Sequence, residues 1–217
     1  MEGKVAEYKA FCDAKLQELK ELYVLNEKNN WKSSEEKDGV KIHSKLHEPS
    51  GLYYIRAETT IKAPAQKVSE LIQDATKTCE WDKTLEVAKI VEQVDKYTFT
   101  YTLSKKPALV VDKRDCVVLS GLYEENGQII FAGASHEHES YPPKDSPVRC
   151  QIILWGYILT PDEKDPNVCN IVYVVLIDPK GWLPKTVTNS VSQDQAMNVR
   201  EIRNFIEGKK QEKKGWF

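Results

Sequence analysis

Hydrophobic positions divide the chain into a helical start, a long run of strands and a helical end. Residues 4–25 place apolar side chains three or four positions apart with charged residues between them, which predicts an amphipathic helix with one buried stripe. The same spacing predicts a long final helix over Pro184–Gly208. A short helix is predicted from Pro64 to about Thr76, because proline suits the first turn of a helix.

Between the first and last helices, runs of β-branched and aromatic residues alternate with turn signals, which is typical of strands. About nine strands are predicted, at Trp31–Glu35, Val40–Leu46, Leu52–Ile61, Glu86–Val94, Tyr97–Ser104, Cys116–Tyr123, Ile129–Ser135, Val148–Thr160 and Cys169–Ile177. Their connections are of hairpin length, which indicates an antiparallel sheet. The last two strands are apolar on both faces. One face must therefore lie under a helix, and the other must meet a second layer or an apolar cavity that the final helix closes.

Composition and charge exclude some classes of protein. The 217 residues suffice for one sizeable core, so we expect a single domain over 1–217 with a charged tail at 209–217. The formal net charge of −2 provides no field that would attract nucleic acid. No apolar run is long enough for a signal peptide or a membrane span, so we expect a cytoplasmic chain. The five cysteines are scattered without a CxxC pair, which favours free thiols over a zinc site or a disulfide framework.

Three motifs carry the strongest functional signal: CEWDKTLE at 79–86, DKRDCVVLSG at 112–121, and VYVVLIDPKGWLPKTVTNSV at 172–191. Their order and spacing resemble the START family, the steroidogenic acute regulatory-related lipid transfer domains. The resemblance covers nearly the whole chain, from the GVKIHSK strand to Asn204. It implies an α+β helix-grip fold, in which a curved antiparallel sheet encloses an apolar cavity closed by a long C-terminal helix. It also implies that 105–113 forms a loop at the mouth of the cavity.

The predicted lipid-binding residues lie in these motifs, on inward strand faces and on the final helix. They are Trp81, Asp82, Phe99, Tyr101, Leu103, Arg114, Cys116, Val118, Ser120, Trp155, Tyr157, Tyr173, Val187 and Val191. On the fifth predicted strand we expect the face with Phe99 to line the cavity, rather than the face with the threonines. For two pairs the residues favour a structural role over direct contact with the ligand: Trp81 and Asp82 as a core anchor, and Arg114–Asp115 as an ion pair that fixes its strand.

The resemblance also bears on the ligand. Sterol carriers of the family usually pair an acidic residue near the end of the fifth strand with a basic residue six positions after the Arg of the Arg-Asp motif. Here that strand carries no acid and the basic position is Ser120, so the wall is neutral. Phosphatidylcholine carriers are matched at Asp82 and Tyr101, but Thr78 and Cys116 replace their arginine and second aromatic ring. The ligand class stays open between a sterol, a phospholipid and another hydrophobic molecule, with an uncharged or weakly polar lipid favoured.

The predicted mouth combines apolar residues with lysines, which suits an anionic membrane surface. Its membrane-gate residues are Lys105, Lys106, Leu109, Val110, Val111, Trp182 and Leu183. The alternative is that the apolar ones simply pack against the last helix. We expect a monomeric lipid-binding and lipid-transfer protein that needs no cofactor or metal and touches membranes transiently. A lipid sensor that signals to a protein partner stays open, as does a helix-grip enzyme, although no GxSxG, HExxH or P-loop motif is present.

Overall fold

The computed structural model describes residues 2–26, 29–33, 36–105, 112–181, 183 and 194–209. Its described helices are α1 (Glu2–Tyr23), α2 (Ala65–Gln73), α3 (Ala75–Trp81) and α5 (Asn198–Ile206). The strands are β1 (Lys32–Ser33), β2 (Lys41–His47), β3 (Leu52–Ile61), β4 (Leu85–Val94), β5 (Tyr97–Ser104), β6 (Arg114–Glu125), β7 (Gln128–Ser135), β8 (Val148–Arg149), β9 (Gln151–Pro161) and β10 (Cys169–Asp178). Along the chain, α1 thus precedes the strands, α2 and α3 lie between β3 and β4, and α5 follows β10.

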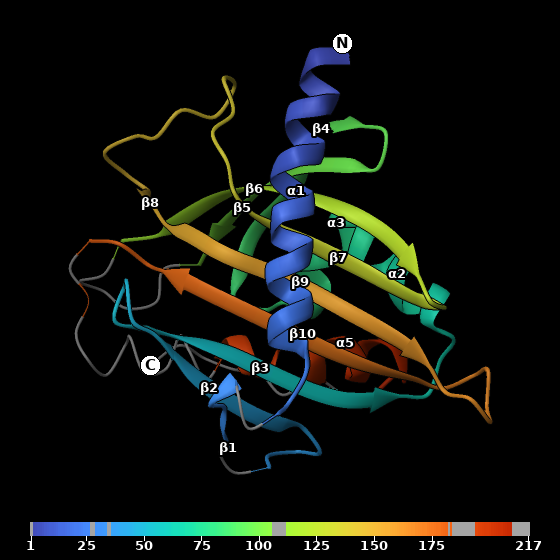
Figure 1. Ribbon diagram of the computed structural model, residues 1–217. Coiled ribbons are helices and arrows are strands. Elements are labelled where there is room, and N and C mark those ends of the chain that lie inside the picture. Colours follow the sequence, from blue (N-terminus) through green and yellow to red (C-terminus); the bar gives the residue numbers. More distant parts are fainter. Residues whose placement is uncertain are drawn as a thin grey trace.

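All ten described strands form one curved sheet (Figure 1). Its order is β1-β2-β3-β10-β9-β7-β6-β5-β4, and neighbours along this path are antiparallel. The short β8 lies off the path and pairs parallel with β6. The predicted α+β architecture with an antiparallel sheet of about nine strands is confirmed. The prediction of a single strand over Val148–Thr160 is wrong. The structure has two strands there, β8 and β9, with Cys150 between them.

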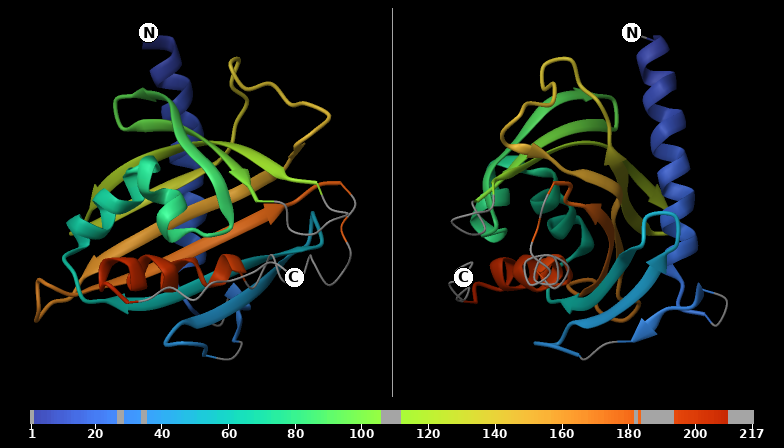
Figure 2. Two further views of the ribbon diagram at one scale, coloured as in Figure 1. Left: turned by 180° about the vertical axis from the view of Figure 1, so that it is seen from behind. Right: turned by 90° about the vertical axis from the view of Figure 1, so that its left-hand side faces the viewer.

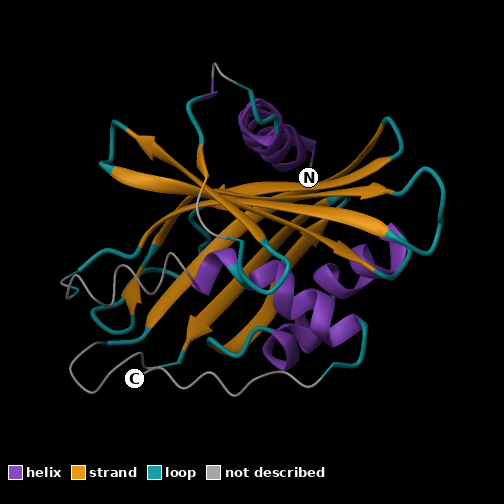
Figure 3. Cartoon of the chain, turned by 90° about the horizontal axis from the view of Figure 1, so that it is seen from below, coloured by secondary structure: helices purple, strands orange, loops and turns teal. Residues whose placement is uncertain are grey.

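Helix α1 covers the convex face of the sheet (Figures 1 and 3). Leu16, Leu19 and Leu22 are buried and pack with the outward apolar side chains of the central strands. The backbone of β9 approaches this helix at Gly156, where an added Cβ would lie 2.5 Å from Leu19 Cδ2 and 2.6 Å from the carbonyl oxygen of Phe131. Glycine therefore permits the close contact between the helix and the sheet.

Helices α2, α3 and α5 lie on the concave side of the sheet (Figure 2). Sequence pattern predicted one helix as far as Thr76, but the chain forms two. The break falls at Asp74, whose carboxylate accepts a hydrogen bond of 3.0 Å from the backbone N–H of Thr76 and caps α3. The second helix carries the chain to Trp81, so that the CEWDKTLE motif begins inside a helix and ends on β4.

Two arginines attach α5 to the turn before β2. Arg200 forms an ion pair with Asp38, while Arg203 donates to the carbonyl oxygen of Asp38 at 2.6 Å and to Thr59 Oγ1 at 2.7 Å. Of the final helix predicted over Pro184–Gly208, the stretch 184–193 lies outside the described residues. Among the residues that are described, no helix is both long and apolar enough to cross a membrane.

Candidate functional site

A cavity of about 550 Å³ lies between the concave face of the sheet and the helices α2, α3 and α5. Strands β4, β5, β6, β7, β9 and β10 contribute to its wall, and Gln195 and Asn198 contribute from the C-terminal segment. Nine of the predicted lipid-binding residues line it: Trp81, Asp82, Arg114, Cys116, Val118, Ser120, Trp155, Tyr157 and Tyr173. Their contact with a lipid stays a prediction, but the fold brings them to one cavity from four elements, α3, β6, β9 and β10, with Asp82 at the end of α3.

Aromatic rings form the wall over β7, β9 and β10. The rings of Tyr157 and Tyr173 stack with centroids 4.5 Å apart, and Trp155 meets Tyr157 edge to face at 5.3 Å. Burial raises the pKa of each tyrosine well above the usual tyrosine value. Both hydroxyls therefore stay protonated at neutral pH and can donate a hydrogen bond. Tyr173 donates to Gln195 Oε1 at 3.0 Å. The sequence analysis missed Gln195, because nothing in the sequence shows that a glutamine at this position faces a cavity rather than solvent.

The expectation for β5 is wrong. The cavity is lined by Thr98, Thr100, Thr102 and Ser104, whereas Phe99, Tyr101 and Leu103 lie on the opposite face of the strand. The Phe99 ring is only 2% exposed and meets Tyr8 of α1 edge to face at 5.2 Å. Tyr101 packs on Tyr141, in the segment that follows β7, at 4.7 Å. The physical reason is that α1 and this segment cover the convex face, and burying them requires apolar partners on the outward side of β5.

Asp82 presents a buried carboxyl group to the cavity. Its Oδ1 accepts hydrogen bonds from the backbone N–H of Thr84 at 3.0 Å and from Thr84 Oγ1 at 2.6 Å. Burial raises the pKa of Asp82 above its usual value, the hydrogen bonds from Thr84 oppose the shift, and the nearby acids Glu201 and Asp194 add to it. In the described part of the chain, no lysine, arginine or histidine forms an ion pair with this carboxyl group. The cavity therefore contains one acid whose ionisation the fold disfavours.

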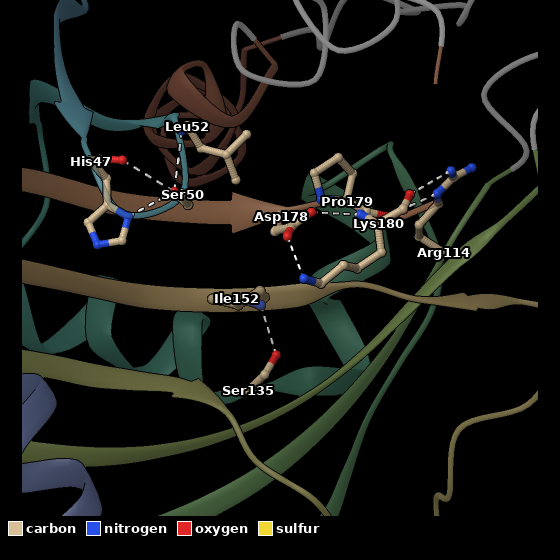
Figure 4. A network of polar contacts seen from close by, with 9 residues as sticks. All are labelled: His47, Ser50, Leu52, Arg114, Ser135, Ile152, Asp178, Pro179 and Lys180. Atoms are coloured by element: carbon tan, nitrogen blue, oxygen red, sulfur yellow. Dashed lines mark hydrogen bonds and ion pairs between the residues drawn. The ribbon is translucent and has the colours of Figure 1, made fainter. Parts of the chain in front are cut away.

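The expected ion pair between Arg114 and Asp115 does not form, because adjacent residues of a strand point to opposite faces. Asp115 instead receives a bidentate pair from Arg149, with both N–O distances at 2.9 Å. The guanidinium of Arg114 donates to the carbonyl oxygens of Pro179 at 3.3 Å and Lys180 at 3.1 Å (Figure 4). It therefore fixes the turn by which the chain leaves β10.

The same turn depends on local backbone chemistry. Lys180 and Gly181 both have positive φ, of 49° and 66°, and glycine adopts such angles without a Cβ penalty. The Asp178 carboxylate accepts a 3.0 Å hydrogen bond from the backbone N–H of Lys180 and pairs with its ammonium group at 2.6 Å (Figure 4). The IDPKG part of the motif is thus explained as a turn that Asp178 and Arg114 hold from two sides.

Cys116 and Cys150 form a disulfide in the cavity wall, with Cα atoms 5.5 Å apart. The prediction of five free thiols is therefore wrong for these two, while Cys12, Cys79 and Cys169 are free. The pairing joins β6 to the junction of β8 and β9 across 34 residues. It depends on the parallel contact between β6 and β8, which no cysteine spacing in the sequence reveals.

At the end of β5, Lys105 and Leu183 line the cavity. The Lys105 ammonium donates to the carbonyl oxygen of Lys83 at 2.8 Å, which holds this lysine beside the connection between α3 and β4. The other predicted gate residues, together with two predicted lipid-binding residues, lie outside the described part of the chain: Lys106, Leu109, Val110, Val111, Trp182, Val187 and Val191. The gate thus stays a prediction from sequence.

Comparison with known proteins identifies the family. The START domain model matches residues 13–212 of this chain. The chain belongs to the START domain family. The mitochondrial steroidogenic acute regulatory protein of Gallus gallus is 29% identical over 189 residues, covering 85% of this chain and 67% of that protein. Its counterpart from Homo sapiens is 26% identical over 193 residues, covering 87% of this chain and 67% of that protein. The matched region thus spans about two thirds of the length of these relatives.

Solved structures show the same fold for this START domain. Human StAR-related lipid transfer protein 5 superposes with a TM-score of 0.83 at 20% identity, covering 94% of this chain and 98% of that one. Human STARD10 superposes with a TM-score of 0.74 at 23% identity, covering 89% of this chain and 80% of that one. The fold predicted from the three motifs is therefore confirmed, with lipid transfer proteins as its named neighbours.

Proposed function

We propose that this START domain binds one lipid molecule in its cavity and transfers it between membranes. The observation that carries the proposal is the cavity of about 550 Å³ with aromatic rings on one wall. Pockets of a few hundred Å³ that are mainly apolar hold ligands of lipid or drug size. Enclosing a few hundred Å² of apolar ligand surface at roughly 25 cal/mol per Å² supplies up to about 10 kcal/mol. The names of related proteins, which include lipid transfer, support the same function.

Transfer rather than catalysis is the function that the wall supports. The three protein side chains best suited to chemistry there are Asp82, Tyr157 and Tyr173, and burial raises the pKa of each. The raised pKa values keep both tyrosines protonated near neutral pH, so neither can act as a general base there. Asp82 is the remaining acid–base candidate of the three, and its carboxyl group is already engaged in two hydrogen bonds from Thr84. Among the described residues, no cluster of three or more histidine, cysteine or acidic side chains is placed to hold a metal ion.

Native mass spectrometry of the full chain, purified from its own cells, tests binding directly. We expect one lipid per monomer, and extraction then identifies the lipid. A chain that carries no lipid, and takes none up from vesicles of mixed phospholipid and sterol, would contradict the proposal. Transfer between donor and acceptor vesicles separates a carrier from a sensor, since a sensor binds lipid tightly but moves it slowly.

Membrane contact through the mouth is the second part of the proposal, and it comes from the apolar tip beside lysines in the sequence. Leu109→Asp combined with Val110→Asp should slow transfer between vesicles at least tenfold, because two charges oppose insertion into the membrane surface. The matched control is Val24→Asp combined with Leu25→Asp, which changes two adjacent apolar residues that are 47% and 41% exposed after α1. Equal transfer rates for both double variants would contradict a membrane gate at this loop.

The location in the cell is also a proposal: cytoplasmic, with transient attachment to membranes. Free thiols no longer support it, because Cys116 and Cys150 form a disulfide. Fractionation of the source cells tests it, and recovery of the protein from an organelle lumen would contradict it. We further propose a monomer, which the mass of the lipid-loaded protein measures in the same native experiment.

A further inference from the structure

The disulfide between Cys116 and Cys150 faces the cavity, and both cysteines line it. The residue before each cysteine points to the other side of the sheet, because neighbouring residues of a strand alternate between faces. There the side chains of Asp115 and Arg149 pair, and they are only 9% and 19% exposed. Arg149 also donates to the carbonyl oxygen of Tyr141 at 3.1 Å. The outward side of the crosslink is thus covered, and the cavity is the side from which a reagent can approach the two sulfur atoms.

Apolar side chains surround the disulfide inside the cavity. Val118, Ile152 and Ile177 pack against the two cysteines, and all three also line the cavity. Cys116 is 8% exposed and Cys150 is 2% exposed. Attack by a thiol therefore requires the reagent to enter the cavity, and Cys116 Sγ is the sulfur atom that it meets first.

The connection between β6 and β8 does not depend on the disulfide alone. On the outward side, Arg149 donates two hydrogen bonds of 2.9 Å to Asp115. The backbone N–H of Cys150 donates to the carbonyl oxygen of Asp115 at 2.9 Å, and that of Val148 donates to the carbonyl oxygen of Lys113 at 3.0 Å. These contacts persist when the sulfur–sulfur bond is broken. Two sulfur atoms that are no longer bonded must stand about 3.5–4 Å apart instead of about 2 Å, so reduction changes the cavity wall while the two strands stay joined.

We propose that the Cys116–Cys150 disulfide is a site of thiol–disulfide exchange with small thiols that enter through the cavity, and that a bound lipid blocks this exchange. The inference rests on the proposed lipid-binding function and adds a chemical reactivity to the same cavity. The redox state of the pair is then set while the cavity is empty, and it is retained while a lipid is bound.

The exchange has two steps. The thiolate of a small thiol attacks Cys116 Sγ and forms a mixed disulfide, while Cys150 Sγ leaves as a thiolate and takes up a proton. A second small thiol then attacks the sulfur of the first, and Cys116 Sγ leaves and is protonated. Two small thiols are thereby oxidised to one disulfide, and the protein gains two electrons and two protons. The oxidised form of the small thiol reverses both steps.

Reduced glutathione is the probe for this exchange. The full chain is delipidated and oxidised with glutathione disulfide, and part of it is then loaded from vesicles of phosphatidylcholine and cholesterol. Native mass spectrometry measures the loaded fraction. Alkylation with iodoacetamide under native conditions, followed by peptide mass mapping, measures how fast each cysteine becomes a free thiol. The rate for the pair should fall in proportion to the empty fraction, so a sample that is nine-tenths loaded should be reduced about tenfold more slowly.

The three free cysteines are internal controls in the same samples. Cys12 and Cys169 are buried and do not line the cavity, so their alkylation reports unfolding of the domain. Both should stay unmodified while the pair is reduced. Cys79 is a partly exposed residue of α3 that does not line the cavity either, and it should be alkylated equally in loaded and empty samples.

Two adjacent valines provide matched variants. Val118 packs beside the disulfide in the cavity wall, whereas Val117 is 1% exposed and packs in the core on the convex side. Val118→Ala should speed the reduction of the empty chain severalfold, because it removes two methyl groups beside the sulfur atoms. Val117→Ala also creates a small cavity in a packed region, but it leaves the path to the disulfide unchanged. Its rate should equal that of the unaltered chain. The comparison of loaded with empty unaltered chain needs neither variant to fold.

Four results would overturn the inference: equal rates in loaded and empty samples, alkylation of Cys12 and Cys169 as fast as the pair opens, equal acceleration by both alanine variants, or no reduction of the empty folded chain by glutathione. In each of these cases the chain still binds lipid, and the proposed function stands. A chain that takes up no lipid from the vesicles would overturn both, and native mass spectrometry shows this before any exchange is measured.

Discussion

Replacement of Asp82 by asparagine should stabilise the protein at neutral pH. The carboxyl group is 9% exposed, and in the described part of the chain it forms no ion pair. Asparagine keeps a carbonyl oxygen at the position of Oδ1, so both hydrogen bonds from Thr84 can persist, while the buried charge is removed. The substitution therefore isolates the cost of ionising this group inside the cavity wall.

The sign of the pH dependence follows from the raised pKa. The folded state holds the proton of Asp82 more tightly than the unfolded chain does. The contribution of this group to stability is therefore greatest below its usual pKa of 3.8. It falls as the pH rises from there through the folded-state pKa, and stays at the lower level above it. The loss is about 1.4 kcal/mol for each unit by which the pKa is raised. Asp82→Asn should match the unaltered protein near pH 3.8 and exceed it in stability at pH 7.

Urea unfolding at several pH values between 4 and 7 measures this difference. Asp82→Ala is the control, because it removes the acceptor as well as the charge and leaves both Thr84 donors without this partner. Two hydrogen bonds at about 1 kcal/mol each make the alanine variant about 2 kcal/mol less stable than the asparagine variant at every pH. The reasoning is refuted if Asp82→Asn is the less stable protein at pH 7, or if its advantage does not grow with pH.

Three further substitutions test the fold around the cavity. Arg203→Met removes donors to Asp38 and Thr59, and should cost about 2 kcal/mol in urea unfolding; a change below about 0.5 kcal/mol would show that packing alone holds α5. Phe99→Leu should lower the free energy of unfolding by about 1 kcal/mol and leave lipid affinity unchanged. A loss of lipid affinity without a loss of stability would indicate that this ring lines the cavity after all. Leu19→Ala, at a fully buried site of α1, should cost about 2–5 kcal/mol in the same assay, and a loss under 1 kcal/mol would contradict its place in the convex core.

Local patterns were sufficient to predict most elements. The strand Leu52–Ile61 and the strand Tyr97–Ser104 agree with the structure at both ends, because turn residues flank an uninterrupted run of strand formers. Breaks inside an element were missed where they depend on partners elsewhere. The chain divides at Cys150 because β8 pairs with β6, and at Asp74 because a side chain caps a new helix. Only the second leaves a local trace, since aspartate is a common N-cap residue.

The candidate site was harder to predict because its residues meet across the sheet. Arg114 lines the cavity, but two of its partners are backbone carbonyls more than 60 residues away, and carbonyls leave no mark in a sequence. The disulfide of Cys116 has the same origin, since its partner lies 34 residues further along. The inward and outward faces of β5 were assigned wrongly from the sequence, because both faces are shielded from solvent, one by α1 and its neighbours and one within the cavity.

The two faces of β5 show how this fold separates stability from recognition. Phe99 packs against α1 in a core that exists whether or not a ligand is present, while Thr98 and Thr100, one position to either side, face the cavity. Because the convex core already buries a large apolar area, the concave wall can carry hydroxyls and even the carboxyl group of Asp82, which a filled core would exclude. Substitutions on the concave wall should therefore change the choice of ligand more than they change the stability of the fold. The reverse should hold for the convex face, and β5 carries both types of position at alternate residues.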